Sequence, residues 1–106
     1  MSPVKALIAT SDPMDATSRH DFARLLRALM QERRRSADSV ARRSRYAGMP
    51  ISRATVYNLI AAEGVPRRET VLGFLRGCGL PAHEQIRWLV TFDRLYPTGR
   101  RTPSPS

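Results

Sequence analysis

The clearest pattern in the chain is an apolar stripe with helical spacing. Phe22 is followed at helical intervals by four apolar residues, namely Leu25, Leu26, Leu29 and Met30. This spacing gives a helix one apolar face. Ser18 is placed to cap the start of that helix, with Asp21 three residues later in the capping-box position. We expect the helix to begin after Ser18 and to fade near Arg35, where three adjacent arginines repel one another.

A second, shorter helix is expected after Ser36, which is a favoured N-cap residue type. Asp38 suits the first turn of that helix, because a carboxylate is favourable at a helix start. Val40 and Ala41 would face inward. The helix should break within residues 46–50, since Pro50 disfavours helix at the residue before it.

A third helix is predicted from its start and stop signals. Ser52 is a candidate N-cap, Glu63 would lie at the end, and Gly64 follows as a stop. Helical geometry places three residues on its buried stripe, namely Val56, Leu59 and Ile60. Five others lie largely on the opposite side: Arg53, Ala54, Tyr57, Asn58 and Ala61.

Two more helices complete the expected architecture. Pro66 is tolerated at the first position of one, which ends at Gly79. Pro81 starts the other, which runs to Tyr96. No strand pattern of useful length and no internal repeat is present. The sequence therefore predicts an all-α, compact domain of five helices.

The two ends of the chain differ from its centre. Residues 1–17 mix Pro, Ser, Asp and Ala without period, and we expect a flexible N-terminal tail there. Residues 97–106 read PTGRRTPSPS, a composition that buries little apolar surface and favours disorder. The expected folding unit is therefore residues 18–96, a size that fits one domain with a modest core.

Charge is concentrated in one part of the chain. The formal net charge is +9, and residues 33–58 hold seven arginines against a single acid, Asp38. Every basic residue except Lys5 is arginine, whose guanidinium can form two parallel hydrogen bonds to an anion. An acidic polymer is the first partner to consider. A coding bias toward arginine is the alternative, and the uneven distribution disfavours it.

Three segments carry a family resemblance: FARLLRALMQERRRSADSVARRS, ISRATVYNLIAAEG and VPRRETVLGFLRGCG. Together they resemble the Xre, or lambda-repressor-like, helix-turn-helix family. In that family Ser36 would match the serine that opens the second helix, and Ala41 the small residue packed against the recognition helix. The start and inner anchor of that recognition helix would be Ser52, Thr55 and Val56. The opening of the fourth helix would be Pro66, Thr70 and Val71.

The turn between the second and third helices departs from the usual pattern. It exceeds the ordinary three to four residues by about five. A similar long turn is familiar from a bacterial subgroup of the family. We expect residues 46–50 to form a flexible wing beside the reading helix, with Gly48 and Pro50 at its exit. Whether the third helix docks at the usual angle stays open.

Sequence-specific binding of double-stranded DNA needs phosphate contacts for affinity and base contacts for sequence choice. Candidate base contacts on the exposed face of the third helix are Arg53, Tyr57 and Asn58; arginine forks onto guanine and asparagine onto adenine. Candidate backbone contacts are Arg42, Arg43, Arg45, Ser52 and Thr55. The alternative is an amphipathic helix with a polar outer face and no ligand. We expect a transcriptional regulator.

An enzymatic function is not expected. His20 and His83 are the only histidines and Cys78 is the only cysteine, so no zinc-like ligand spacing and no internal disulfide exist. Cys78 lies on an apolar helix side and suits a structural thiol. We expect no catalytic residues, no metal and no cofactor. We also expect no membrane association, because no secretory signal or spanning run is visible, and a cytoplasmic, nucleoid-associated bacterial protein.

The last helix motivates a second class of function. Ile86, Leu89 and Val90 form one apolar stripe, and a second consists of Trp88, Phe92, Leu95 and Tyr96. A helix at the edge of a small domain rarely needs both stripes for its own core. The second stripe is therefore a candidate interface for a homodimer or a protein partner. The competing interpretation is that this stripe half-covers the first helix.

Overall fold

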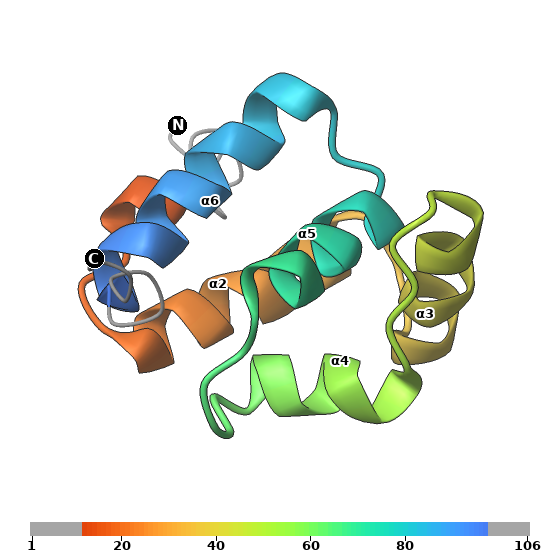
Figure 1. Cartoon of the computed structure of the whole chain (residues 1–106), viewed down its shortest axis with the longest axis horizontal. Coiled ribbons are helices and arrows are strands. Elements are labelled where there is room, and N and C mark those ends of the chain that lie inside the picture. Colours follow the sequence, from red (N-terminus) through yellow and green to blue (C-terminus); the bar gives the residue numbers. More distant parts are fainter. Residues whose placement is uncertain (1–11, 98–106) are drawn as a thin grey trace, which may run out of the picture.

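The computed structural model describes residues 12–97, and its secondary structure there is helical throughout, without strands (Figure 1). A short 3-10 helix, η1 (Pro13–Asp15), comes first. Five α-helices follow: α2 (Arg19–Glu32), α3 (Ala37–Tyr46), α4 (Arg53–Ile60), α5 (Arg68–Gly77) and α6 (Ala82–Leu95). The all-α prediction of five helices is confirmed. The outer ends of both predicted tails lie outside the described residues.

Serine side chains begin three of the helices as predicted. The hydroxyl of Ser18 accepts a hydrogen bond from the backbone N–H of Asp21 at 3.0 Å. Ser36 and Ser39 form a reciprocal capping box at the start of α3. At the start of α4, the Ser52 hydroxyl accepts from the backbone of Thr55 at 3.1 Å. Each cap satisfies a backbone donor that the helix itself leaves unpaired, so the helix starts are well defined.

Four of the five α-helices end with a residue in the left-handed conformation, and two of these four residues are unexpected. After α3 and α5, a glycine adopts the left-handed conformation, Gly48 and Gly79. After α2 and α4 the same position is occupied by Arg34 and Ala62, with φ of 54° and 59°. The prediction that α4 runs to Glu63 and stops at Gly64 is therefore wrong. Ala62 already turns the chain, and the N–H of Glu63 donates to the carbonyl of Asn58 at 2.9 Å.

The core draws residues from all five α-helices, with α5 at its centre (Figure 1). Phe22 and Leu26 from α2 and Phe74 and Leu75 from α5 are all completely or almost completely buried. Phe22 and Leu26 belong to the apolar stripe that the sequence predicted, so helical spacing identified the buried face of α2.

The close approach of α3 to α5 is made possible by glycine. A Cβ atom on Gly77 would lie 2.5 Å from the carbonyl oxygen of Val40. One turn earlier, a Cβ on Gly73 would overlap the carbonyl oxygen of Met49 and approach Ile51. Both glycines therefore let other backbone segments lie directly on α5. They act in helix packing, which fixes α3 and the following turn against the core.

Part of the segment predicted as a flexible N-terminal tail packs on the domain. Ala16 is 1% exposed and belongs to the core, and η1 lies against α6. The carboxylate of Asp12 pairs with Arg87 at 2.8 Å, and Arg94 donates to the carbonyl of Ala16 at 2.9 Å. Residues 12–17 therefore extend the folded unit beyond the predicted boundary at Ser18. Short apolar anchors such as Ala16 leave no periodic signal in a sequence.

Candidate nucleic-acid interface

One face of α4 is open to solvent, and it carries the three predicted base-contact residues. Val56 and Leu59 hold the opposite face in the core. The exposed residues of α4 are Arg53, Ala54, Tyr57 and Asn58. In Figure 1 this helix lies along one side of the molecule, with its long side uncovered by other described segments. The face is therefore accessible to a large partner.

The exposed residues of α4 form an ordered strip. With about 3.6 residues per turn, Arg53 and Asn58 lie on its two edges and Ala54 and Tyr57 lie between them. Tyr57 is 54% exposed, so it is not part of the core. Small Ala54 allows a partner to approach the helix closely. The strip thus combines long polar groups at the edges with an accessible centre.

Arg53 has a partner on another helix, which spacing along the chain does not reveal. Its Nη1 atom donates to Oδ1 of Asp38, in the first turn of α3, at 3.3 Å. Both side chains remain more than half exposed. The only acid within residues 33–58 is therefore next to a predicted reading residue. The sequence indicated Asp38 only as a helix-start residue, because nothing in linear order places it beside Arg53.

Ser52 and Thr55, the predicted backbone contacts on α4, interact with each other. Their hydroxyl oxygens lie 2.9 Å apart, in addition to the capping bond. Ser52 is exposed and Thr55 is half-buried. Their first role is to begin α4, and they leave its first backbone N–H groups at the surface next to the exposed strip.

The predicted phosphate contacts on α3 extend away from the start of α4. Arg42, Arg43 and Arg45 are all exposed. However, α3 begins beside the start of α4 and leads away from it (Figure 1). Arg45 follows Asp38 by seven residues, which is about 10 Å along the helix axis. The structure therefore groups Asp38 with α4 and places Arg43 and Arg45 toward the far end of α3.

The long turn between α3 and α4 is a packed strap rather than a flexible wing. Residues 47–52 run back along α3, and the N–H of Ile51 donates to the buried hydroxyl of Ser44 at 3.0 Å. Arg76 donates to the carbonyl of Ala47 at 3.3 Å, and Met49 lies on Gly73. The expectation of a flexible wing is corrected, because a side-chain anchor and a glycine contact hold this segment. The adjoining Tyr46 ring is 85% exposed.

A shallow hollow borders the other edge of α4. Asn58 and Thr55 line it on one side, and the α4–α5 loop with Arg67 and Thr70 on the other. Its volume is about 260 Å³. Arg67 is exposed beside this edge, and the sequence analysis did not select it. The signal that could have found it is a basic residue directly after Pro66 at the start of a helix.

The predicted interface on the last helix is mostly core. Trp88, Phe92 and Tyr96 are each at most 5% exposed, and Leu95 is half-buried. The ring of Phe22 packs within 6.4 Å of the rings of all three. These residues therefore cover α2, and the prediction of an exposed interface on this stripe is corrected. The exposed apolar side chains of α6 are instead Ile86 and Val90.

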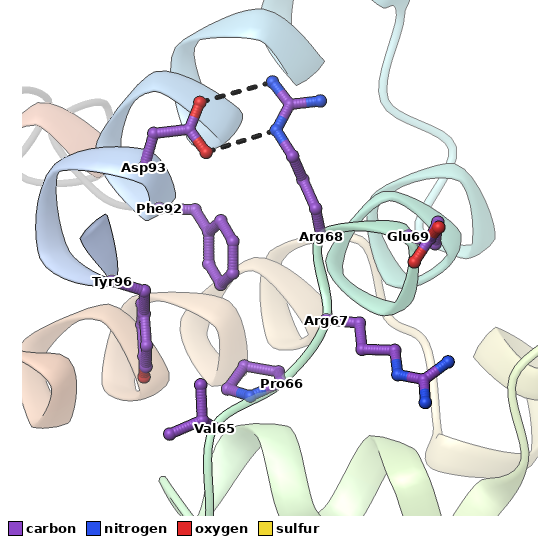
Figure 2. A pocket seen from close by; sticks show the side chains of 8 residues that line it. All are labelled: Val65, Pro66, Arg67, Arg68, Glu69, Phe92, Asp93 and Tyr96. Carbon is purple, nitrogen blue, oxygen red and sulfur yellow. Dashed lines mark hydrogen bonds and ion pairs between the residues drawn. The ribbon is translucent and has the colours of Figure 1, made fainter. Parts of the chain in front are cut away.

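A cavity of about 390 Å³ opens between the start of α5 and the end of α6. Figure 2 shows Phe92 and Tyr96 on its α6 side, facing Val65 and Pro66 from the loop that follows α4. Arg68 closes one rim through a two-pronged ion pair with Asp93, at 3.2 and 3.3 Å. None of the predicted DNA contacts lines this cavity.

The remaining side chains of reactive or metal-binding types form no second candidate site within residues 12–97. Cys78 is completely buried, and this burial raises the pKa of its thiol to about 12. Among residues 12–97 no cluster of His, Cys, Asp and Glu is arranged to hold a metal. Within the same range no helix is long and apolar enough to cross a membrane. The exposed strip of α4 and its surroundings are the candidate site.

Comparison with known proteins adds one finding. The model of a family described as a helix-turn-helix domain matches residues 21–89. This range runs from the first turn of α2 to the middle of α6 and includes every residue of the α4 strip. No curated protein and no solved structure matches the chain.

Proposed function

The chain belongs to the helix-turn-helix domain family, and from this premise we propose that it binds double-stranded DNA sequence-specifically as a transcriptional regulator. We further propose that it is Xre-like within the family, on the residue matches at Ser36, Ser52 and Pro66. In this proposal α4 enters the major groove and its exposed strip faces the base edges.

The observation that carries the proposal is the exposed strip of α4 beside a concentration of arginine. A helix anchored by Val56 and Leu59 presents Arg53, Tyr57 and Asn58 outward. A major groove about 12 Å wide admits one such helix. The neighbouring arginines supply the positive potential that draws in a polyanion.

The residues divide into two roles. Arg53 and Asn58 read bases from the two edges of the strip, and Tyr57 contacts the groove between them. Ser52 and Thr55, with the backbone N–H groups at the start of α4, contact phosphate. Arg42, Arg43 and Arg45 supply further phosphate contacts along the flanking backbone. Of these three, Arg42 stands closest to Asp38 in the helix, one turn away.

The test is duplex binding with selection from a randomised pool, followed by titrations on the preferred duplex at several salt concentrations. Each neutralised phosphate should contribute a slope of about −0.9 in log K against log salt. Arg53→Ala or Asn58→Ala should cost about 1–3 kcal/mol on the preferred duplex and relax the preference at one position.

The matched control is Arg43→Ala, which removes the same charge as Arg53→Ala from α3. This variant should bind all duplexes more weakly by about the same factor, and the slope of log K against log salt should fall in magnitude by about one. The proposal that α4 reads the bases is wrong if all three variants lose affinity for every duplex to the same degree. If the wild type does not bind at low salt, the proposal of DNA binding is wrong.

A second candidate function, protein interaction through α6, is favoured by two residues outside the four-residue stripe that was predicted. Ile86 and Val90 lie one turn apart on α6 and are 59% and 52% exposed. They would pair with a second copy of the chain, which would let two modules read two half-sites about one helical turn apart. The contact would be small, so the two copies would pair mainly when both are bound to one DNA molecule, which raises the effective concentration of each near the other.

Sedimentation equilibrium and binding to a duplex with two half-sites test this candidate. Because both side chains are exposed, the double variant Ile86→Ser/Val90→Ser should fold normally. We expect it to bind a single half-site like the wild type but to lose cooperative binding to the double site. If the wild type and the double variant bind the double site with equal cooperativity, this face of α6 is not an interface.

A further inference from the structure

The contact between Asp38 and Arg53 joins two helix starts that are independently held. The capping box of Ser36 and Ser39 defines the first turn of α3, which carries Asp38. The Ser52 cap defines the start of α4, whose first residue is Arg53. The Arg53 Nη1 atom lies 3.3 Å from Asp38 Oδ1. The two capped first turns therefore fix the backbone positions from which Asp38 and Arg53 meet.

The pair has little value for the stability of the free protein. Its arginine and aspartate side chains are 61% and 65% exposed, and ion pairs at such positions contribute little to folding. An acid at this place also opposes attraction to DNA, because Asp38 is the only negative side chain within residues 33–58. Asp38 also suits the first turn of α3 as a helix-start carboxylate, but that role does not require a contact with Arg53. An effect on the direction of Arg53 accounts for the contact.

We propose that Asp38 is a specificity-determining residue that positions Arg53 toward a guanine and away from phosphate; this inference rests on the proposed function. A free arginine beside DNA has phosphates within reach on either strand, since the duplex carries one charge per about 1.7 Å of axis. Asp38 occupies one N–H of the guanidinium. The guanidinium has five N–H donors, so an edge remains for O6 and N7 of guanine.

The second carboxylate oxygen of Asp38 adds to the preference for a G·C pair. Carboxylates accept hydrogen bonds from the N4 amino group of cytosine in the major groove. They repel phosphate and the O4 atom of thymine, so Asp38 penalises alternatives to a G·C pair at this position. In the complex water is displaced from the pair, and the charge interaction strengthens as the local dielectric falls. The substrate class is thus duplex DNA with a G·C pair facing the start of α4.

The experiment compares three full-length variants with the wild type. Asp38→Asn removes the charge of the positioning residue, and Asp38→Glu retains it. Asp93→Asn is the matched control, because Asp93 also pairs with an arginine, Arg68, but on the α5–α6 side. Circular dichroism establishes that each protein is folded. Dissociation constants are measured for the duplex selected by the wild type and for a scrambled duplex of equal length, and the pool selection is repeated with Asp38→Asn.

The wild type should show a strong G·C preference at one position. Asp38→Asn should lose roughly fivefold or more of its discrimination, the low end of one base contact, mainly because the scrambled duplex binds more tightly. Asp38→Glu should recover part of the discrimination, and Asp93→Asn should match the wild type. Asp38→Asn with unchanged discrimination and an unchanged G·C preference would overturn this inference while leaving DNA binding intact. A wild type that binds no duplex would overturn both.

Discussion

The buried thiol of Cys78 shows how position controls the chemistry of a single residue. It is the only cysteine in the chain, and burial raises its pKa to about 12. Only the thiolate reacts readily with alkylating reagents. The folded protein should therefore resist iodoacetamide at pH 8, and it should be labelled at the rate of an ordinary thiol in denaturant. Stoichiometric labelling of the folded protein would show that Cys78 is accessible.

The same residue predicts a pH dependence of stability. An unfolded thiol has a pKa of about 8.5, whereas folding raises that of Cys78 to about 12. The folded state binds the proton more tightly, so the contribution of Cys78 is fully present below about pH 8.5 and is lost as pH rises toward 12. Urea unfolding of the wild type and of Cys78→Ala should converge in stability across this range. Parallel curves would contradict the assignment.

At the scale of the helix, the end of α4 contains a residue that is poorly suited to its conformation. Ala62 has φ of 59°, which a side chain makes unfavourable and which glycine adopts readily. Ala62→Gly should therefore raise the free energy of unfolding by about 1 kcal/mol. The matched control is Ala61→Gly, whose φ of −101° does not favour glycine. It should lower stability by about 0.5–1 kcal/mol.

Denaturant titrations of the two glycine variants provide the measurement. If both glycines change stability in the same direction, the left-handed turn does not lie at Ala62. A terminus of α4 at Glu63, as the sequence indicated, would also remove the difference between the variants. The result therefore distinguishes the two possible ends of the reading helix.

At the scale of the whole molecule, the packing of α3 on α5 depends on Gly77. Alanine is the better helix former, yet its Cβ would lie 2.5 Å from the Val40 carbonyl oxygen. Overpacking of this kind costs about 1–3 kcal/mol, so Gly77→Ala should lower the free energy of unfolding in urea. It should also weaken duplex binding, because α3 carries Asp38 and the strap that leads to α4. An alanine variant more stable than the wild type would show that the two helices are not in close contact.

The elements were predictable from the sequence, whereas their mutual placement was not. Apolar stripes, serine caps and the proline and glycine residues at helix ends identified all five helices, because these signals are local. On α6, however, two apolar stripes compete, and the tertiary packing, including the ring of Phe22, turns Trp88 and Phe92 inward while Ile86 and Val90 face solvent. The pairing of Asp38 with Arg53 is equally non-local. Spacing within one helix carries no information about which neighbour it meets.

The strap of residues 47–52 has a consequence for how this chain tolerates changes in length. It returns along α3 over the distance that the end of α3 covers, from Ser44 toward the level of Asp38. A turn added to α3 is thus matched by a longer return, and the two increments cancel at the start of α4. Insertions or deletions made as such matched pairs would leave the register between the two helix starts unchanged. The long turn is therefore the place where paired changes in length would offset each other before the helix that follows it.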